Sequence, residues 1–487
     1  MRQRLGGLGL VAMAAVGVVS CRPSDVLSVP ALAGVLASST LQNQSGAESE
    51  FNSAKAQVFY AADGFYGYGV LGSSELLTDE FTFSAFSIFG DVINANVDAR
   101  ETAAFGGFRE LGDYPWRGIL QARAGMVLAL PALKTYEPAS GRAKIGEAYA
   151  LLGYAELIVA EAYCAGTPLD QVLPGGGVAY GAVLTTDSML GVAEGHFDSA
   201  VAEAHGDAPT AALAGVGLGR TLLDRGLYAA AATAVASVPT SFVYNTELQP
   251  NGNTAPYTVG LYGDAVQYSG GRIFNVSDVE GGNGLNFVSA HDPRLGLDSS
   301  MLTPDGGVWY LPTKFEANLS YIPLATGVEA QLIAAEAALQ AGQSGTWLTA
   351  LNTLRNSGCT VPGVDSTCSL GSGQVPGQTT GVASLADPGT DSGRVSLMFR
   401  ERAFWLFGTG TRLGDLRRLI RQYGRDQSTL FPVGPYAPTH QNQLPTPLPT
   451  YGTDVTLPLP TPAGLAASGL TIGNPNYKGC ITSTKTA

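Results

Sequence analysis

The chain has 487 residues, of which 45% are hydrophobic, so it can bury a large core in one domain or two. Aspartate and glutamate outnumber lysine and arginine by 40 to 27, which gives a formal net charge of −13. This acidic balance, without a basic block, argues against binding to nucleic acid or to an anionic membrane surface, because both depend on clustered basic side chains.

The first 21 residues are typical of an export signal. Arg2 and Arg4 precede an uncharged apolar run at 8–19, which is shorter than the roughly 20 residues needed to span a bilayer. The run ends in VVSC, which resembles the lipobox of bacterial lipoproteins. We therefore expect a signal peptide at 1–20, a diacylglycerol and an N-acyl lipid on Cys21, and a polar tether at 21–49. An ordinary signal peptide with an incidental cysteine is the alternative.

Helical periodicity dominates from residue 50 onward, where we predict a single domain over 50–487. Apolar residues recur at helical spacing in 114–134, where Pro131 is expected to weaken the end of the helix. After Pro138, the stretch 140–169 predicts an amphipathic helix of about 25 residues, with small residues at close-packing positions.

Two later segments, 211–238 and 329–356, match tetratricopeptide helix pairs, in which small residues let two helices cross closely. Gly226 is expected to make the first turn. Gly342 precedes Ala350 by eight residues, where Gly226 precedes Ala231 by five, which predicts a three-residue insertion at the second turn. Generic helical hairpins are the alternative.

The helical period disappears in a loop insertion at 245–323, with short strands expected at RIFNV and VWYLP. A last helical region, 394–426, precedes a proline-rich tail. The predicted fold class is thus mainly all-α, an α/α superhelix with tetratricopeptide-like pairs and long irregular loops that carry a few short strands.

Four cysteines remain after Cys21. Cys359 and Cys368 flank a short loop and are the disulfide candidates, whereas a bond between Cys164 and Cys480 follows only by elimination. The sequence has neither a CxxC motif nor a His-x3-His pair, so we predict no metal site and no cofactor.

Two charged groups could be taken for reactive sites, and we interpret both as structural. The adjacent Asp79 and Glu80 point in different directions and lack a partner at the separation that glycoside hydrolysis needs. Arg412 and Asp415 lie three residues apart, a spacing that commonly braces a helix end. The same interpretation covers the other arginines of that cluster, Arg402, Arg417 and Arg418. The prediction is therefore a protein without catalysis, and a glycosidase is the competing hypothesis.

Several separated motifs, taken in order, are similar to those of the SusD/RagB family of outer-membrane lipoproteins. They are the lipobox at Cys21, SELLTDEF at 74–81, YPWRGILQAR at 114–123, HDPR at 291–294 and FWLFGTGTRLGDLRR at 404–418. The resemblance implies a lipid-anchored protein at the surface of the outer membrane that binds a nutrient, most often an oligosaccharide. It also implies a partner, a TonB-dependent barrel transporter of the SusC type. A tetratricopeptide scaffold lipoprotein that only organises an envelope complex is the alternative, and glycan, peptide and other polymers all stay open as ligands.

Aromatic and amide side chains on loops are the ligand-binding candidates, because sugar rings stack on flat aromatics and sugar hydroxyls match amides. One group follows TDEF, a region that often feeds the binding surface in the resembled family: Phe83, Phe86, Phe89, Asn94 and Asn96. A second group lies in the loop insertion: Tyr257, Tyr262, Tyr268, Trp309 and Tyr310. For each of these residues, packing within an irregular segment is the alternative.

Overall fold

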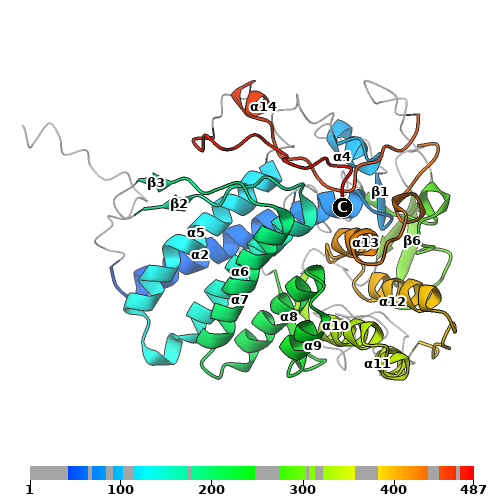
Figure 1. The fold of residues 1–487 in the computed structure, drawn as a ribbon, viewed down its shortest axis with the longest axis horizontal. Coiled ribbons are helices and arrows are strands. Elements are labelled where there is room, and N and C mark those ends of the chain that lie inside the picture. The colour runs from blue at the N-terminus through cyan, green and yellow to red at the C-terminus, as the bar shows by residue number, and fades with distance from the viewer. Residues whose placement is uncertain are drawn as a thin grey trace, which may run out of the picture.

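Helices dominate the described part of the chain (Figure 1). The computed structural model describes residues 42–63, 69–83, 91–102, 114–173, 177–246, 274–302, 307–312, 322–356, 382–436, 449–467 and 472–487. No helix within these ranges is long and apolar enough to cross a bilayer. Several predicted features lie outside them: the signal peptide, Cys21 with its lipid, Phe86, Phe89, the side chain of Asn94, Tyr257, Tyr262, Tyr268, Cys359 and Cys368.

The first half of the chain forms long helices that lie side by side, α2 along α5 and α6 along α7 (Figure 1). Their bounds are α2 Gln44–Asp63, α3 Val70–Leu76, α4 Asp91–Asp98, α5 Tyr114–Tyr136, α6 Ala143–Ala162 and α7 Thr186–Glu203, with a 3₁₀ turn at Ala139–Gly141. Helix α2 begins at Gln44, inside the stretch 21–49 that is predicted to be a tether, and its residue Ala47 is already buried. Helix α5 continues past Pro131 and ends at Tyr136.

Helix α6 is the central helix of this group. The sequence predicted an amphipathic helix, which is wrong for its second half, because every residue from 150 to 162 is buried. Neighbouring helices α2, α5, α7, α8 and α13 all contact α6, so it has no solvent-facing side there. Helix α7 can approach α6 closely because α6 carries small residues there: a Cβ added at Gly153 would lie only 2.9 Å from the ring of Phe197.

Two helix pairs follow and stack on one another, which confirms the prediction of packed helix pairs in these segments. They are α8 Ala208–Asp224 with α9 Tyr228–Val235, and α10 Gly327–Gln340 with α11 Ser344–Asn356. The turns are equivalent, because Gly226 and Gly342 both have left-handed φ values, +72° and +73°, and the second helix starts two residues after each. The insertion predicted at the second turn is therefore wrong. Trp347, not Ala350, occupies the position equivalent to Ala231. The side chains of Trp347 and Ala231 are both fully buried.

The C-terminal part returns to the end of α6. It contains α12 Asp391–Trp405, α13 Arg412–Arg421, a 3₁₀ turn at Gln427–Thr429 and α14 Pro462–Ala467. A disulfide joins Cys164 to Cys480, with 5.6 Å between their Cα atoms, so the pairing obtained by elimination is confirmed. Nearby, the rings of Trp116 and Tyr477 stack with centroids 5.4 Å apart.

The strands within the described ranges form antiparallel pairs. They are β1 Phe81–Phe83 with β5 Phe274–Val276, β2 Gln171–Val172 with β3 Val178–Ala179, β4 Val243–Asn245 with β8 Pro323–Thr326, and β6 Leu297–Leu302 with β7 Val308–Pro312. Strands β5 and β7 confirm the two strands predicted at RIFNV and VWYLP. A 3₁₀ turn at Glu280–Gly282 follows β5.

Candidate functional site

Ligand candidates from two distant parts of the sequence meet in one place, which we call the strand cluster and define as β1, β5, β6 and β7. Phe83 lies opposite Phe274 in the β1–β5 pair. The indole N–H of Trp309 donates to the Phe274 carbonyl over 2.9 Å, and the backbone N–H of Tyr310 donates to Oδ1 of Asn275 over 2.8 Å. Contacts between β5 and β7 therefore hold the two groups of candidates together.

The candidates in the strand cluster differ in exposure. Phe83 is 4% exposed and Trp309 is completely buried, which favours a packing role for both. Tyr310 is only partly buried. On α4, which contacts β1, Asn96 is 9% exposed. Ligand contact stays a prediction for all four residues, and Tyr310 is the best placed of them.

Two buried carboxyl groups that no sequence pattern indicated lie next to the strand cluster. Asp98, at the end of α4, accepts hydrogen bonds from the hydroxyls of Tyr436 over 2.8 Å and Thr82 over 3.4 Å. Burial nevertheless raises the pKa of Asp98 to about 7. Burial and the nearby Asp98 also raise the pKa of Glu280 well above its ordinary value, although the hydroxyl of Tyr451 donates to it over 3.0 Å. Only the tertiary fold brings these acids together, since no motif links them.

The SELLTDEF motif binds directly to the arginine-rich motif. Nε and Nη2 of Arg412 donate to the two oxygens of Asp79 over 2.8 and 3.0 Å, and the backbone N–H of Leu285 donates to the same carboxylate over 2.7 Å. The neighbouring Glu80 is fully buried and accepts from the backbone N–H of Gly408 over 3.3 Å. The structural interpretation of Asp79 and Glu80 is confirmed.

The predicted brace between Arg412 and Asp415 is wrong. Asp415 instead accepts from Arg402 and from Arg418, each over 2.7 Å. Arg417 donates to the backbone carbonyls of Ala160 and Glu161 at the end of α6. The arginines of this motif are thus buried structural groups, as interpreted, but with different partners.

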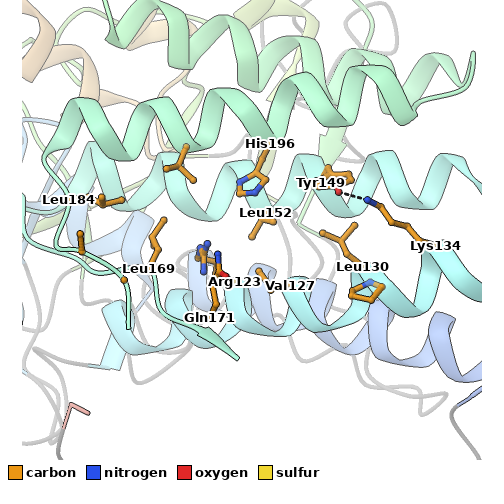
Figure 2. A pocket seen from close by; sticks show the side chains of 14 residues that line it. Arg123, Val127, Leu130, Lys134, Tyr149, Leu152, Leu169, Gln171, Leu184 and His196 are labelled. Atoms are coloured by element: carbon orange, nitrogen blue, oxygen red, sulfur yellow. Dashed lines mark hydrogen bonds between the residues drawn. The ribbon is translucent and has the colours of Figure 1, made fainter. Parts of the chain in front are cut away.

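A separate hollow, the inter-helix pocket, lies between α5, α6, α7 and the chain on either side of the β2–β3 pair (Figure 2). Its volume is about 510 Å³, within the range of small-molecule sites. The side chains that line it are mainly aliphatic, and its charged lining residues are basic. The lining consists of Arg123, Val127, Leu130, Pro131, Lys134, Tyr149, Leu152, Leu169, Gln171, Gly181, Ala182, Leu184, Val192 and His196.

Comparison with known proteins places this architecture among the SusD folds. No family model and no curated protein matches the sequence. A solved SusD superfamily protein from Bacteroides vulgatus matches with a TM-score of 0.56 at 15% identity, covering 89% of this chain and 99% of its own. NanU from B. fragilis matches with a TM-score of 0.54 at 12% identity, covering 90% and 96%. A SusD-like carbohydrate binding protein from B. vulgatus matches with a TM-score of 0.52 at 15% identity, covering 77% and 83%.

The class of protein defined by these matches is a helical one with stacked helix pairs and short sheets. The chain has the SusD fold, and the fold predicted from the ordered motifs is confirmed.

Proposed function

We propose that this protein is a lipid-anchored nutrient-binding protein of the outer-membrane surface, which captures an oligosaccharide and passes it to a TonB-dependent transporter of the SusC type. The observation that carries the proposal is the fold, which spans nearly the whole length of several SusD-fold proteins and matches one described as carbohydrate binding. The acyl chains proposed on Cys21 would supply the anchor.

The strand cluster supports a sugar-binding surface. Beside Tyr310, the edge of the β6–β7 pair exposes Leu302 and Val308, which are register partners and are 55% and 42% exposed. Apolar C–H faces of a sugar ring pack on such a surface, and an aromatic ring adds stacking. On the same hairpin, Ser300 of β6 is exposed and Asp298 is partly buried, and the two are joined by hydrogen bonds from Ser300 to the Asp298 carboxylate. Their oxygens suit sugar hydroxyls.

Binding without catalysis fits the acidic residues of the SELLTDEF motif, Asp79 and Glu80. Asp79 is 1% exposed and is engaged by Arg412 and Leu285, and Glu80 is fully buried. A glycosidase would need two carboxyl groups facing each other across an open cleft. These two residues have no such access, so the glycosidase hypothesis loses the two candidates on which it was based.

Calorimetric titration of the full chain with a panel of oligosaccharides tests the proposal. We expect at least one oligosaccharide to bind with micromolar affinity, and the Tyr310→Ala variant to bind it roughly tenfold more weakly, because a stacking ring is lost. Tyr60→Ala, which removes an exposed tyrosine on α2, is the matched control and should bind like the parent. Absence of binding by every oligosaccharide at millimolar concentration would reject the proposal.

A further inference from the structure

Arg123 occupies the inter-helix pocket in an unusual way for a buried arginine. It comes from the middle of α5 and is 7% exposed. Its Nε donates to Oε1 of Glu156 over 2.7 Å, and Oε2 of the same carboxylate lies 2.6 Å from Nδ1 of His196. Neither Nη atom of Arg123 has a hydrogen-bond partner among the residues that the structure describes. The guanidinium therefore uses one of its donors on the protein and keeps the outer ones available.

The electrostatic balance of the pocket favours an anion. Arg123, Lys134 and His196 line it, whereas Glu156 is 1% exposed and already shared between two of them. Asp170 does not line the pocket, and its Oδ1 accepts from the backbone N–H of Gly181 over 2.8 Å and from Asn474 over 2.6 Å. In a chain of net charge −13, a basic pocket is a local exception. A planar guanidinium with two free Nη atoms matches a carboxylate, which can accept from both.

The rest of the pocket is apolar. Figure 2 shows Arg123 and His196 near the middle, with Leu169 and Leu184 toward one end and Leu130 toward the other. At that second end, Lys134 donates to the hydroxyl of Tyr149 over 2.6 Å, so its charge is partly engaged. A polyhydroxylated acid would place its hydroxyls against these aliphatic walls without hydrogen bonds, which is costly. A hydrocarbon body would instead bury apolar area there.

We propose that the inter-helix pocket binds a small organic carboxylate with an aliphatic or aromatic body. The carboxylate bonds to the Nη atoms of Arg123, and the apolar body lies against the leucines that line the pocket. Glu156 is a positioning residue, because it holds the guanidinium on one side and the His196 ring on the other. This inference goes beyond the proposed function, since it concerns a second ligand at a site formed by α5, α6 and α7, apart from the strand cluster.

Titration of the full chain with octanoate and phenylacetate tests the proposal, with octanamide and phenylacetamide as uncharged partners of the same shape. We expect at least one acid to bind, and its amide to bind about ten- to a hundredfold more weakly, as for the loss of a charge-assisted hydrogen bond. Equal binding of acid and amide would overturn the role of Arg123. Failure of both acids to bind at millimolar concentration would overturn the proposal itself.

Two variants separate the pocket from the rest of the surface. Ala182 is exposed and lines the pocket, so Ala182→Trp should fill it and weaken binding of the acid by tenfold or more. Ala236→Trp places the same side chain at an exposed position after α9 and should have no effect. The double variant Arg123→Met/Glu156→Gln removes both charges together, so that neither is left buried alone, and should abolish the preference for acid over amide. Unchanged binding in Ala182→Trp would contradict the site.

A third acid, galacturonate, tests whether the ligand has an apolar body. Galacturonate carries a carboxylate on a polyhydroxylated ring, and we expect it to bind at least tenfold more weakly than the better of the two acids. Tighter binding of galacturonate would overturn the assignment of a hydrocarbon body. Oligosaccharide titration of Ala182→Trp distinguishes the two proposals, because sugar binding at the strand cluster should survive this change, and a failure of either proposal leaves the other testable.

Discussion

Two regions of the molecule bury arginine against carboxylate and use it differently. In the closed arginine cluster, which consists of Arg402, Arg418, Asp415, Glu336 and Asp224, residues of α8, α10, α12 and α13 meet. In the open arginine site, which consists of Arg123, Glu156 and His196, three helices meet beside the inter-helix pocket.

The number of acceptors around each arginine accounts for the difference. Arg418 bonds to Glu336 and Asp415, with Nη2 distances of 3.0 and 2.7 Å, and its Nε lies 3.3 Å from Asp224. Arg123 has the single carboxylate of Glu156. A guanidinium surrounded by carboxylates fixes helices relative to each other, whereas one with spare donors beside a cavity can bind a ligand. The predictions below separate these roles, starting with the largest expected effect.

Removing Arg418 should cause the largest loss of stability. Arg418→Met would leave the carboxylates of Glu336, Asp415 and Asp224 buried without this partner, and breaking such a buried pair costs about 3–5 kcal/mol. Urea unfolding followed by circular dichroism measures the change. Arg421→Met, on the exposed side of the same helix, is the matched control and should change the free energy of unfolding by less than about 0.5 kcal/mol. Similar losses in the two variants would show that the cluster does not stabilise the fold.

Asp98 and Asp415 are both buried, and only Asp415 has arginine partners, so their effects on stability should run in opposite directions with pH. Burial raises the pKa of Asp98 to about 7, so the folded protein holds a proton that the unfolded chain, with a pKa near 3.8, has lost. The contribution of Asp98 to the free energy of unfolding is complete below about pH 4. It is lost as the pH rises through 7, by up to about 1.4 kcal/mol per pH unit. Asp98→Asn should flatten this fall.

Asp415 supplies the matched comparison. Burial would raise the pKa of Asp415, but the charges of Arg402 and Arg418 outweigh burial and hold its pKa below the ordinary value. Its contribution is present above about pH 4 and is lost as the pH falls below that value. Urea unfolding of the parent and both asparagine variants from pH 3 to 8 measures the two slopes. A slope of the same sign for both residues would contradict the assigned partners.

The sequence predicted the regular elements because their signals are local. A helical period and a turn glycine are each visible within a few helical turns of sequence, and α8 to α11 follow these signals. The error at the second turn arose from aligning Ala350 by residue size, whereas the left-handed Gly342 fixes the spacing and places Trp347 there.

The sites were harder to predict because tertiary pairing decides them. The sequence does not distinguish Trp309 from Tyr310, since both are aromatic residues of one predicted strand. Neighbouring residues of a strand face opposite sides, and the pairing of β7 determines that Trp309 is the buried one. The partner of Arg412 is Asp79, more than 300 residues away, rather than Asp415 on its own helix. No single sequence motif marks the inter-helix pocket: Arg123 ends the motif at 114–123, but the other basic residues, Lys134 and His196, lie further along α5 and on α7.

The smallest expected effect is the most informative about the open arginine site. Arg123→Met should reduce the free energy of unfolding by about 1–2 kcal/mol, less than the loss expected for Arg418→Met, because one charged hydrogen bond to Glu156 is lost and Glu156 keeps His196 as a partner. The same variant should lose binding of the organic carboxylate, which Arg418→Met should retain under conditions where it stays folded. Unfolding curves and acid titrations of both variants give the two measurements. A loss in Arg123→Met as large as that in Arg418→Met, with carboxylate binding unchanged, would mean that both arginines serve the fold and that the number of acceptors does not separate them.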